Sequence, residues 1–421
     1  MFAEVSEMER TVLHCDCNSF FASVETVAHP EYSKVPMAVC GSVENRHGIV
    51  LAKNELAKKA GVSTGEVIWK AKQKCPSLLV VHPTYGLYSQ YSEAVNSIYY
   101  EYTDRIEPFG IDESWLDVTG SYKLFGDGRR IADILRERIK RELGITISVG
   151  VSFTKTFAKL GSDYKKPDAT TLISRENYKQ LLFPLPVDTL LFVGRHTKEK
   201  LHMLGINTIG ELAAAAPSFL TESFGRTGES LYNAATGAYD GEVAVYGSSH
   251  EEKSIGNGCT FRRDIMNYED ARCALTVICD EVGYRMRKAG VKGRVVTVGM
   301  RDTGLSVITR RCTLENPTCS SHTLADVAFS LMKEYWGERK PLRSLTVTAS
   351  DFIRQSDGEQ LRLFYSESEM LDMRRERLER AVDGIRAKYG NGVLIHGVEA
   401  CEMRTKTLIY CCNNGNNVIY L

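Results

Sequence analysis

The hydrophobic pattern near the start of the chain predicts a strand followed directly by a helix. Residues 11–15 form an apolar, β-prone run that ends in Asp16. Asn18 and Ser19 are both good helix N-caps and precede a helical pattern that runs to residue 25. We therefore expect Asp16 to lie at the C-terminal end of a strand.

A second strand region, residues 106–118, surrounds a polar centre. Asp112 and Glu113 are flanked by apolar residues, and Pro108 and Gly110 are poor residues for a strand interior. This pattern predicts two strands that meet at a bend. Antiparallel pairing with the first strand would place Asp16 opposite the bend, so three carboxylates would lie on the edge of one sheet.

The rest of the N-terminal half follows a split βαβ order. Helical patterns cover residues 88–102 and 129–143, and residues 145–152 form a β-rich run. An insertion separates them from the first strand and helix. It contains strand-like residues 35–40 and 48–52 and a helix over 54–60 that ends at Gly61. The pattern predicts an α+β, ferredoxin-like sheet with a small inserted module.

The C-terminal half divides into a helical part, an α/β part and a tail. Residues 172–240 are helical, and residues 201–212 have the pattern of a helix-hairpin-helix. Residues 250–354 alternate strands and helices. A charged helix follows over residues 371–389, and the remaining tail is poorly patterned. Plain helix packing is the alternative interpretation of the helical part.

Composition is that of a multidomain globular protein. A chain of 421 residues is long enough for roughly two to four domains. Its twelve cysteines show no paired spacing of a zinc site. The charged first ten residues are unlike a signal peptide, and no apolar run approaches the ~20 residues that span a bilayer. We expect a reducing, cytoplasmic location and no membrane partner.

Net charge is zero, with 53 basic and 53 acidic residues, which argues weakly against a nucleic-acid-binding protein. The distribution changes this picture. Between residues 285 and 312, eight basic residues accompany one acidic residue, Asp302: Arg285, Arg287, Lys288, Lys292, Arg294, Arg301, Arg310 and Arg311. A solvated helix face is one explanation. We favour a phosphate-facing stripe on neighbouring strands because the surplus is so one-sided.

The three carboxylates predict a divalent metal site. Adjacent negative charges are costly to hold together unless a cation lies between them, and oxygen ligands suit Mg²⁺. A solvated acidic turn is the alternative for Asp112 and Glu113 taken alone. The matching context of Asp16 favours the metal site.

Two stretches carry a family resemblance. Residues 14–25 resemble the first active-site motif of the Y-family (translesion) DNA polymerases, and residues 111–117 resemble the second. The likeness runs from about residue 11 to residue 364, and the Asp-x-Asn form of the first motif is closer to the UmuC branch than to the DinB branch. It implies a right-hand polymerase with these parts: palm 1–25 and 78–171, small fingers 26–77, thumb 172–240, little finger 250–354 and tail 355–421.

The resemblance also implies the chemistry. A damage-tolerant, low-fidelity DNA polymerase would transfer a nucleotide from a dNTP to a primer 3′-hydroxyl on template DNA, with two Mg²⁺ ions. Asp16 and Asp112 would bridge the ions, Glu113 would hold the catalytic one, and the Cys17 carbonyl would be a further ligand.

Further residues would contact the nucleotide. Phe21 falls at the steric-gate position that excludes ribonucleotides, beside Phe20, which we also place at the nucleotide but which has the pattern of a core aromatic. Lys159 and, with a surface lysine as the alternative, Lys58 would meet the triphosphate.

The resemblance assigns DNA contacts to the thumb and little finger. Gly205 and Gly210 of the helix-hairpin-helix would hold duplex phosphates. The basic stripe would supply Arg285, Arg287, Lys288, Lys292, Arg294, Arg310 and Arg311. One departure stands out, because Phe192 replaces the first glycine of the family's usual Gly-x-Gly, which predicts a weaker phosphate grip there.

The tail predicts a protein partner. Residues 360–364 resemble a bacterial sliding-clamp-binding peptide, in which Gln360 would enter a polar pocket and Leu361, Leu363 and Phe364 an apolar one. An ordinary strand is the alternative. Accessory subunits are further expected partners.

Two other functions stay open at this point. A palm-type nucleotidyl cyclase also uses two metals but needs no thumb hairpin, basic stripe or clamp peptide. A catalytically silent, clamp-tethered DNA-binding scaffold would keep those parts and lose carboxylates.

Overall fold

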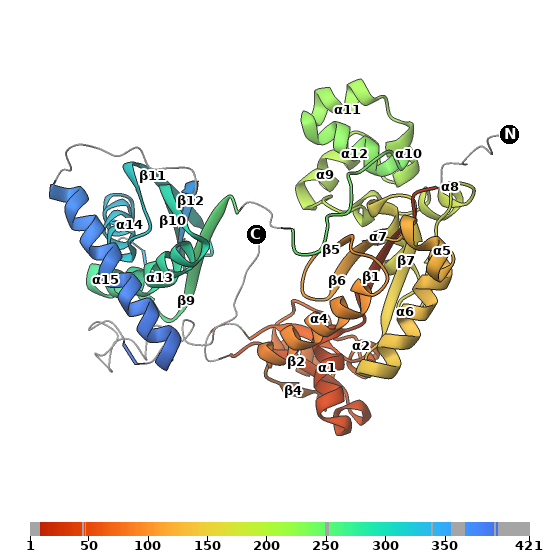
Figure 1. Ribbon diagram of the computed structural model, residues 1–421, viewed down its shortest axis with the longest axis horizontal. Coiled ribbons are helices and arrows are strands. Elements are labelled where there is room, and N and C mark those ends of the chain that lie inside the picture. The colour runs from red at the N-terminus through yellow and green to blue at the C-terminus, as the bar shows by residue number, and fades with distance from the viewer. Residues whose placement is uncertain are drawn as a thin grey trace. The chain divides into compact units, whose positions relative to one another are not determined.

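The computed structural model describes residues 9–43, 46, 48–248, 252–337, 340–354, 367–390 and 393–394. The chain divides into two compact units, one holding the elements from β1 to α12 and the other those from β9 to α15 (Figure 1). Within the described residues, no helix is long and apolar enough to cross a membrane.

The palm is a five-stranded sheet in the order β5-β6-β1-β7-β8. β1 lies at its centre and pairs antiparallel with β6 and β7, as a split βαβ pattern predicts. The palm elements are β1 Val12–Cys17, α1 Phe20–Ala28, α4 Tyr85–Tyr100, β5 Ile106–Pro108, β6 Glu113–Asp117, α5 Tyr122–Phe125, α6 Gly128–Leu143, β7 Ile147–Ser152, α7 Lys155–Tyr164 and β8 Thr170–Leu172.

The two faces of the palm sheet are covered differently. On one face, Leu13 and Leu116 pack against buried residues of α1, α4 and α6 and form the palm core. On the other face, α7 packs against the sheet through Ala158, which joins Val12 and Trp115 in a separate small cluster. Since successive strand residues alternate in direction, Asp16 and Glu113 lie on the α7 face.

The fingers are a small insertion with their own three-stranded sheet, in the order β3-β2-β4. Their elements are β2 Met37–Cys40, β3 Val50–Lys53, α2 Glu55–Lys59, α3 Ile68–Lys74 and β4 Leu79–Val81. β4 pairs parallel with β2. The predicted fingers boundary at residue 77 is therefore wrong, because the short apolar run after it completes the fingers sheet instead of returning to the palm.

The thumb consists of short helices around one core. They are α8 Tyr178–Leu182, α9 Arg195–Met203, α10 Ile209–Ala214, α11 Pro217–Phe224 and α12 Arg226–Thr236. The α9–α10 pair is the predicted helix-hairpin-helix. Gly205 turns the chain between them with φ +79°, a conformation that glycine adopts without steric cost.

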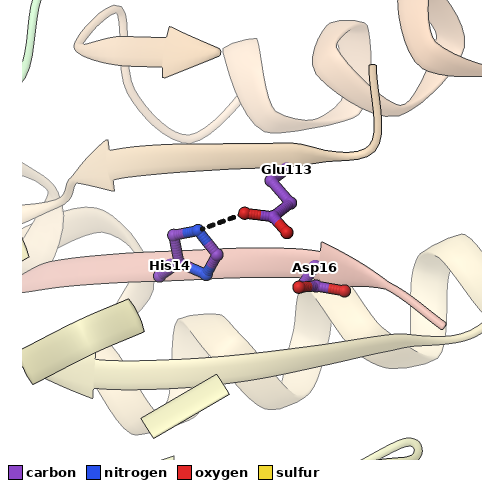
Figure 2. Close-up of side chains that lie close together, drawn as sticks. All are labelled: His14, Asp16 and Glu113. Carbon is purple, nitrogen blue, oxygen red and sulfur yellow. Dashed lines mark ion pairs between the residues drawn. The ribbon is translucent and has the colours of Figure 1, made fainter. Parts of the chain in front are cut away.

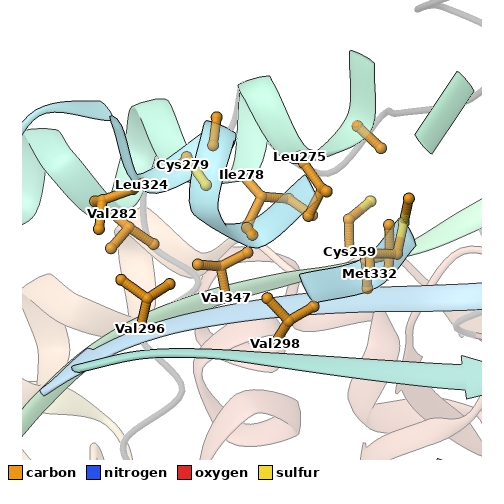
Figure 3. Packing of buried hydrophobic residues seen from close by; sticks show 14 of the residues in the cluster. Cys259, Leu275, Ile278, Cys279, Val282, Val296, Val298, Leu324, Met332 and Val347 are labelled. Atoms are coloured by element: carbon orange, nitrogen blue, oxygen red, sulfur yellow. The ribbon is translucent and has the colours of Figure 1, made fainter. Parts of the chain in front are cut away.

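The second unit is an α/β little finger. Its four-stranded sheet has the order β11-β10-β12-β9. Valines of β10 and β12 pack under α13 and α14 (Figure 3). The elements are β9 Ser254–Ile265, α13 Tyr268–Ala289, β10 Val291–Asp302, β11 Val307–Thr318, α14 Ser321–Trp336, β12 Leu342–Arg354 and α15 Glu367–Tyr389.

Candidate active site

The strand register brings the three predicted carboxylates together. Asp16 pairs directly with Glu113 across β1 and β6, and the Cys17 amide donates a hydrogen bond to the Asp112 carbonyl at 3.0 Å. Asp112 lies in the bend between β5 and β6, where Gly110 adopts φ +131°. The expected convergence of Asp16, Asp112 and Glu113 is therefore present.

These carboxylates line a pocket of about 340 Å³. The other lining residues come from the palm and the fingers: Cys17, Ser19, Phe20, Phe21, Leu51, Ala52, Lys53, Lys58, Thr64, Ile111 and Lys166. The pocket thus combines acidic, basic and aromatic side chains.

Two lysine side chains bind the carboxylates. Lys159 on α7 lies 3.2 Å from Asp16 and 2.9 Å from Glu113, measured between ammonium nitrogen and carboxylate oxygen. Lys166 lies 2.6 Å from Asp16 and 2.8 Å from Asp163. Burial tends to lower the pKa of both lysines, but the carboxylate charges outweigh it and raise the pKa. Both lysines therefore carry positive charge at neutral pH.

The three carboxylates have different proton affinities. Burial, reinforced by the charges of Asp16 and Glu113, raises the pKa of Asp112 to about 6. Burial also raises the pKa of Asp16, in spite of the nearby Lys166 and Lys159. For Glu113, the effect of burial is outweighed by the close contact with the His14 ring and the charge of Lys159, and the pKa is about 2.

His14 is a member of this cluster that the sequence pattern did not single out. Its Nε2 lies 3.4 Å from Oε2 of Glu113, and its side chain is fully buried on β1 (Figure 2). One nitrogen of His14 and one oxygen each of Asp16 and Glu113 lie within 4.8 Å of one another. The period of two along a strand was the available signal, since residue 14 must share the face of residue 16.

Lys166 was also missed. It follows α7 and precedes Pro167, and nothing in its local pattern separates it from the neighbouring Lys165. Only the fold of the palm brings residue 166 to Asp16, 150 positions earlier in the chain.

Phe21 and Phe20 differ in their surroundings. The Phe21 ring is half-buried and stacks on Tyr88 at 4.2 Å between ring centroids, with an interplanar angle of 13°. Phe20 is 3% exposed and belongs to the palm core. Both residues line the pocket, but Phe21 is half-buried whereas Phe20 is part of the palm core.

The predicted capping of α1 is wrong in its details. Ser19 stands at the N-cap with φ +49°, and its side chain makes no capping hydrogen bond. Asn18 instead binds Thr146 and Ser148 at the start of β7. These contacts tie the end of β1 to β7.

The predicted DNA contacts of the second unit need correction. Arg287 is 7% exposed, and its guanidinium binds Glu379 and Asp383 of α15 at 2.7 and 2.6 Å. Lys292 pairs with Glu376. Arg287 and Lys292 therefore fasten α15 to the unit and are not a phosphate-facing pair.

Other members of the stripe point in different directions. Arg285 donates a hydrogen bond to the Gly256 carbonyl, and Arg310 lies over the Tyr335 ring at 4.6 Å. Exposed residues of the stripe are Lys288, Arg294, Arg301, Arg310 and Arg311. The stripe is thus not one continuous surface, since strand alternation and the α13 helix turn its members away from one another.

The two predicted thumb glycines also differ. A side chain on Gly210 would meet Phe183 at 3.0 Å, and the Gly210 amide donates to the Phe183 carbonyl. Gly210 is therefore a packing glycine whose amide is already used. Gly205 forms the exposed turn between α9 and α10.

The predicted triphosphate contact Lys58 lies in the fingers. Its side chain is half-exposed, and its ammonium nitrogen is 3.6 Å from a carboxylate oxygen of Glu55.

Comparison with known proteins defines the class. Residues 15–163 match the impB/mucB/samB family, residues 252–363 its C-terminal domain, and residues 190–238 the DNA polymerase-iota thumb domain. A solved Y-family DNA polymerase chimera, Dbh-Dpo4(243-245)-Dbh, superposes with a TM-score of 0.72 at 23% identity. The superposition covers 82% of this chain and 100% of the solved chain. Fold and site thus define a right-hand polymerase.

Curated relatives make the assignment closer. DNA polymerase IV of Acetivibrio thermocellus is 45% identical over 386 residues, which cover 91% of this chain and 96% of the relative. DNA polymerase IV of Clostridium kluyveri is 34% identical over 395 residues, covering 93% and 98%. The chain belongs to the impB/mucB/samB family of Y-family DNA polymerases. It is a DNA-directed DNA polymerase, and these relatives do not confirm a closer likeness to the UmuC branch.

Proposed function

We propose that this translesion polymerase transfers nucleotides by two-metal chemistry at the pocket of Asp16, Asp112 and Glu113. The observation that carries the proposal is the convergence of three carboxylates from β1, the bend and β6. The donor set fits Mg²⁺, because oxygen ligands predominate and two ammonium groups already bind there. Oε2 of Glu113 already lies 2.9 Å from the Lys159 ammonium, so the pocket places positive charge at this oxygen.

The bound ions would lower the pKa of the primer 3′-hydroxyl and offset charge on the departing pyrophosphate. Asp16, Asp112 and Glu113 would hold them, with the Cys17 carbonyl as a further ligand. Lys159 and Lys166 contact the same carboxylates from α7 and the segment after it. When cations occupy the carboxylates, these ammonium groups become free to bind triphosphate oxygens, and Lys58 reaches the pocket from the fingers.

Sugar choice and damage tolerance follow from the walls of the pocket. The face of Phe21 is fixed by stacking on Tyr88, whose hydroxyl donates to Glu25 at 2.5 Å. A rigid ring below the sugar leaves no room for a 2′-hydroxyl.

The fingers contribute helices of only five and seven residues, α2 and α3, so they offer little surface to check the shape of the base pair.

Duplex DNA would be held by backbone and small side chains. Gly194 is the N-cap of α9 and has no side chain, so it leaves the first amides of this nine-residue helix without a capping acceptor of its own. In the little finger, the sheet face opposite α13 is built of small residues, with paired rows Arg311–Thr297–Thr348–Gly256 and Thr309–Gly299–Thr346–Gly258. Such a flat face, with Arg311 at its edge, can approach phosphates without reading sequence.

The clamp partner stays a proposal based on sequence. Residues 360–364 lie outside the described residues, between the end of β12 at Arg354 and the start of α15 at Glu367. A clamp would raise the effective concentration of a weakly gripping polymerase at the primer end. Accessory subunits as partners likewise stay a prediction.

The test is primer extension with Mg²⁺ on an undamaged and on a lesion-bearing template. We expect extension of both. Product from a nucleoside triphosphate alone, without primer, would instead identify a cyclase, and DNA binding without either product would identify a silent scaffold. The thumb and little finger favour the polymerase, because a cyclase has no use for them.

A further inference from the structure

His14 is a buried polar residue that the proposed chemistry does not use. It lies on β1 two residues before Asp16, with its side chain fully buried, and shares the sheet face of the carboxylates. Its Nε2 is 3.4 Å from Oε2 of Glu113 and makes no well-formed hydrogen bond to any described residue (Figure 2). A fully buried imidazole aimed at one carboxylate calls for a physical explanation.

The other ring nitrogen is held from the opposite side. Nδ1 of His14 lies 2.8 Å from Oγ of Ser162 on α7, and Ser162 is 1% exposed. This contact depends on Gly150, the residue of β7 that pairs with His14. A Cβ on Gly150 would lie 1.9 Å from the Ala158 carbonyl oxygen, so only glycine lets α7 pack this closely.

The donor and acceptor chemistry then allows one favourable arrangement. A carboxylate oxygen can only accept, so Nε2 must carry the proton of a neutral ring, and Nδ1 must accept from the Ser162 hydroxyl. The Ser162 hydroxyl has a second, competing acceptor, because it can also donate to the Lys159 carbonyl at 2.8 Å. If the hydroxyl donated to the Lys159 carbonyl, the ring proton would have to be on Nδ1. The Nε2 lone pair would then face the carboxylate of Glu113, and two acceptors facing each other repel.

We propose that His14 is a positioning residue, which holds the Glu113 carboxylate through Nε2–H in a tautomer set by Ser162. The proposal rests on the metal site proposed above. The chain Ser162–His14–Glu113 fixes the orientation of Glu113 before a cation arrives, and His14 itself is not a ligand. Mutation of a residue that hydrogen-bonds to a metal ligand commonly lowers metal affinity by about 10–100-fold.

The experiment measures Mn²⁺ affinity of the full chain by the electron paramagnetic resonance signal of free Mn²⁺. His14→Leu removes both ring nitrogens, whereas His14→Gln keeps an amide N–H that can reach Glu113. Ser162→Ala removes the donor to Nδ1. Ser152→Ala is the matched control, because Ser152 is an equally buried serine whose hydroxyl donates to the Ile173 carbonyl instead.

We expect His14→Leu to weaken Mn²⁺ binding by about 10–100-fold, Ser162→Ala by a smaller factor, and His14→Gln and Ser152→Ala by less than about threefold. The KM for dNTP should stay unchanged while the Mg²⁺ requirement rises. If His14→Leu does not fold, His14→Gln and Ser162→Ala still give the comparison. Equal Mn²⁺ affinity in Ser162→Ala and wild type would overturn the proposal.

Spectroscopy separates positioning from ligation. With ¹⁵N-histidine protein, electron spin echo spectra of bound Mn²⁺ should show no directly coordinated imidazole nitrogen. A coordinated nitrogen that disappears in His14→Gln would make His14 a ligand and overturn the positioning role. Absence of Mn²⁺ binding by the wild type would contradict the metal site itself, which is a separate outcome.

Discussion

At the residue scale, the carboxylate cluster is a site where function opposes stability. Burial raises the pKa of Asp112 to about 6, with the charges of Asp16 and Glu113 as the next causes. A carboxyl whose pKa is higher in the folded than in the unfolded chain favours folding only while it is protonated. Without metal, the folded protein therefore loses stability as the pH rises from about 4 to about 6.

Asp112→Asn should remove most polymerase activity and leave DNA affinity nearly intact, because the amide binds Mg²⁺ poorly. In the metal-free protein it should also raise stability by roughly 1–3 kcal/mol above pH 7 and have no effect below pH 4. Single-nucleotide insertion, a DNA titration and melting curves at both pH values measure this. Glu113→Gln is the second variant, and activity within a few fold of wild type in the double variant would contradict the site.

Phe21→Ala should raise the efficiency of ribonucleotide insertion relative to its deoxy counterpart, because the ring stacked on Tyr88 is removed from beneath the sugar. The measurement is kcat/KM for both nucleotides. Phe20→Ala is the control. Since Phe20 is a core residue, this variant should lose about 3–5 kcal/mol of stability and keep its sugar preference. An unchanged ratio in Phe21→Ala would assign Phe21 to the core as well.

At the element scale, the hairpin before α9 carries an unusual residue. Phe192 adopts φ +66°, is 81% exposed, and meets Phe109 edge-on at 6.3 Å between ring centroids. A left-handed conformation costs a non-glycine residue about 1 kcal/mol. Phe192 precedes Gly194, the N-cap of α9, by two residues, and this N-terminus is the phosphate site that we propose.

Phe192→Gly should therefore tighten duplex binding and steepen its salt dependence by about one phosphate contact. Phe192→Ala is the control, because it removes the ring and keeps the strained backbone. The alanine variant should be about 1 kcal/mol less stable than the glycine variant. Binding isotherms at several salt concentrations and melting curves test both statements, and an identical salt slope in all three proteins would show that the hairpin holds no phosphate.

Helix α15 is fastened to the little finger by charge. Its inner face presents Asp372, Glu376, Glu379, Asp383 and Arg386 to partners on and around α13 and α14. Arg287→Ala would leave two carboxylates without their partner in a largely buried network. It should destabilise this unit by about 3–5 kcal/mol, seen as an earlier melting step.

The exposed Arg311 is the matched control for Arg287. Arg311→Ala should leave melting unchanged and weaken duplex binding in a salt-dependent way. If Arg287→Ala weakened DNA binding without loss of stability, its assignment to the α15 network would be wrong.

At the scale of the whole molecule, the proposed clamp peptide is residues 360–364, which lie in the chain between β12 and α15. Changing both Leu363 and Phe364 to Ala should abolish clamp binding and shorten products on clamp-loaded DNA. Each side chain contributes roughly 1.5–3 kcal/mol if fully buried in a groove. Insertion on short, clamp-free primers should not change. Arg362→Ala is the control, and clamp affinity that survives the double change would leave the segment without this partner.

The sequence by itself determined the carboxylate triad and the order of elements. Asp16, Asp112 and Glu113 each follow a strand-like run or a bend, and the period of two in a strand is local enough to be read from residue order. Pro108 and Gly110 indicated the bend because both are poor residues for a strand interior. The helix-hairpin-helix around Gly205 was predicted from the resemblance of residues 201–212 to the family's thumb.

Tertiary structure decided which basic side chains are exposed and which are buried in ion pairs within the protein. Arg287 and Arg311 have equally basic neighbourhoods in the sequence, but one is buried against α15 and the other is exposed at a sheet edge. Likewise, Lys166 and Ser162 reach β1 only because α7 packs on Gly150. Partners of this kind lie about 100 residues or more apart, and chain-distant contacts between charges leave no periodic trace in the sequence. The physical reason is that burial, which sets their pKa and their availability, is a property of the packed sheet and helices.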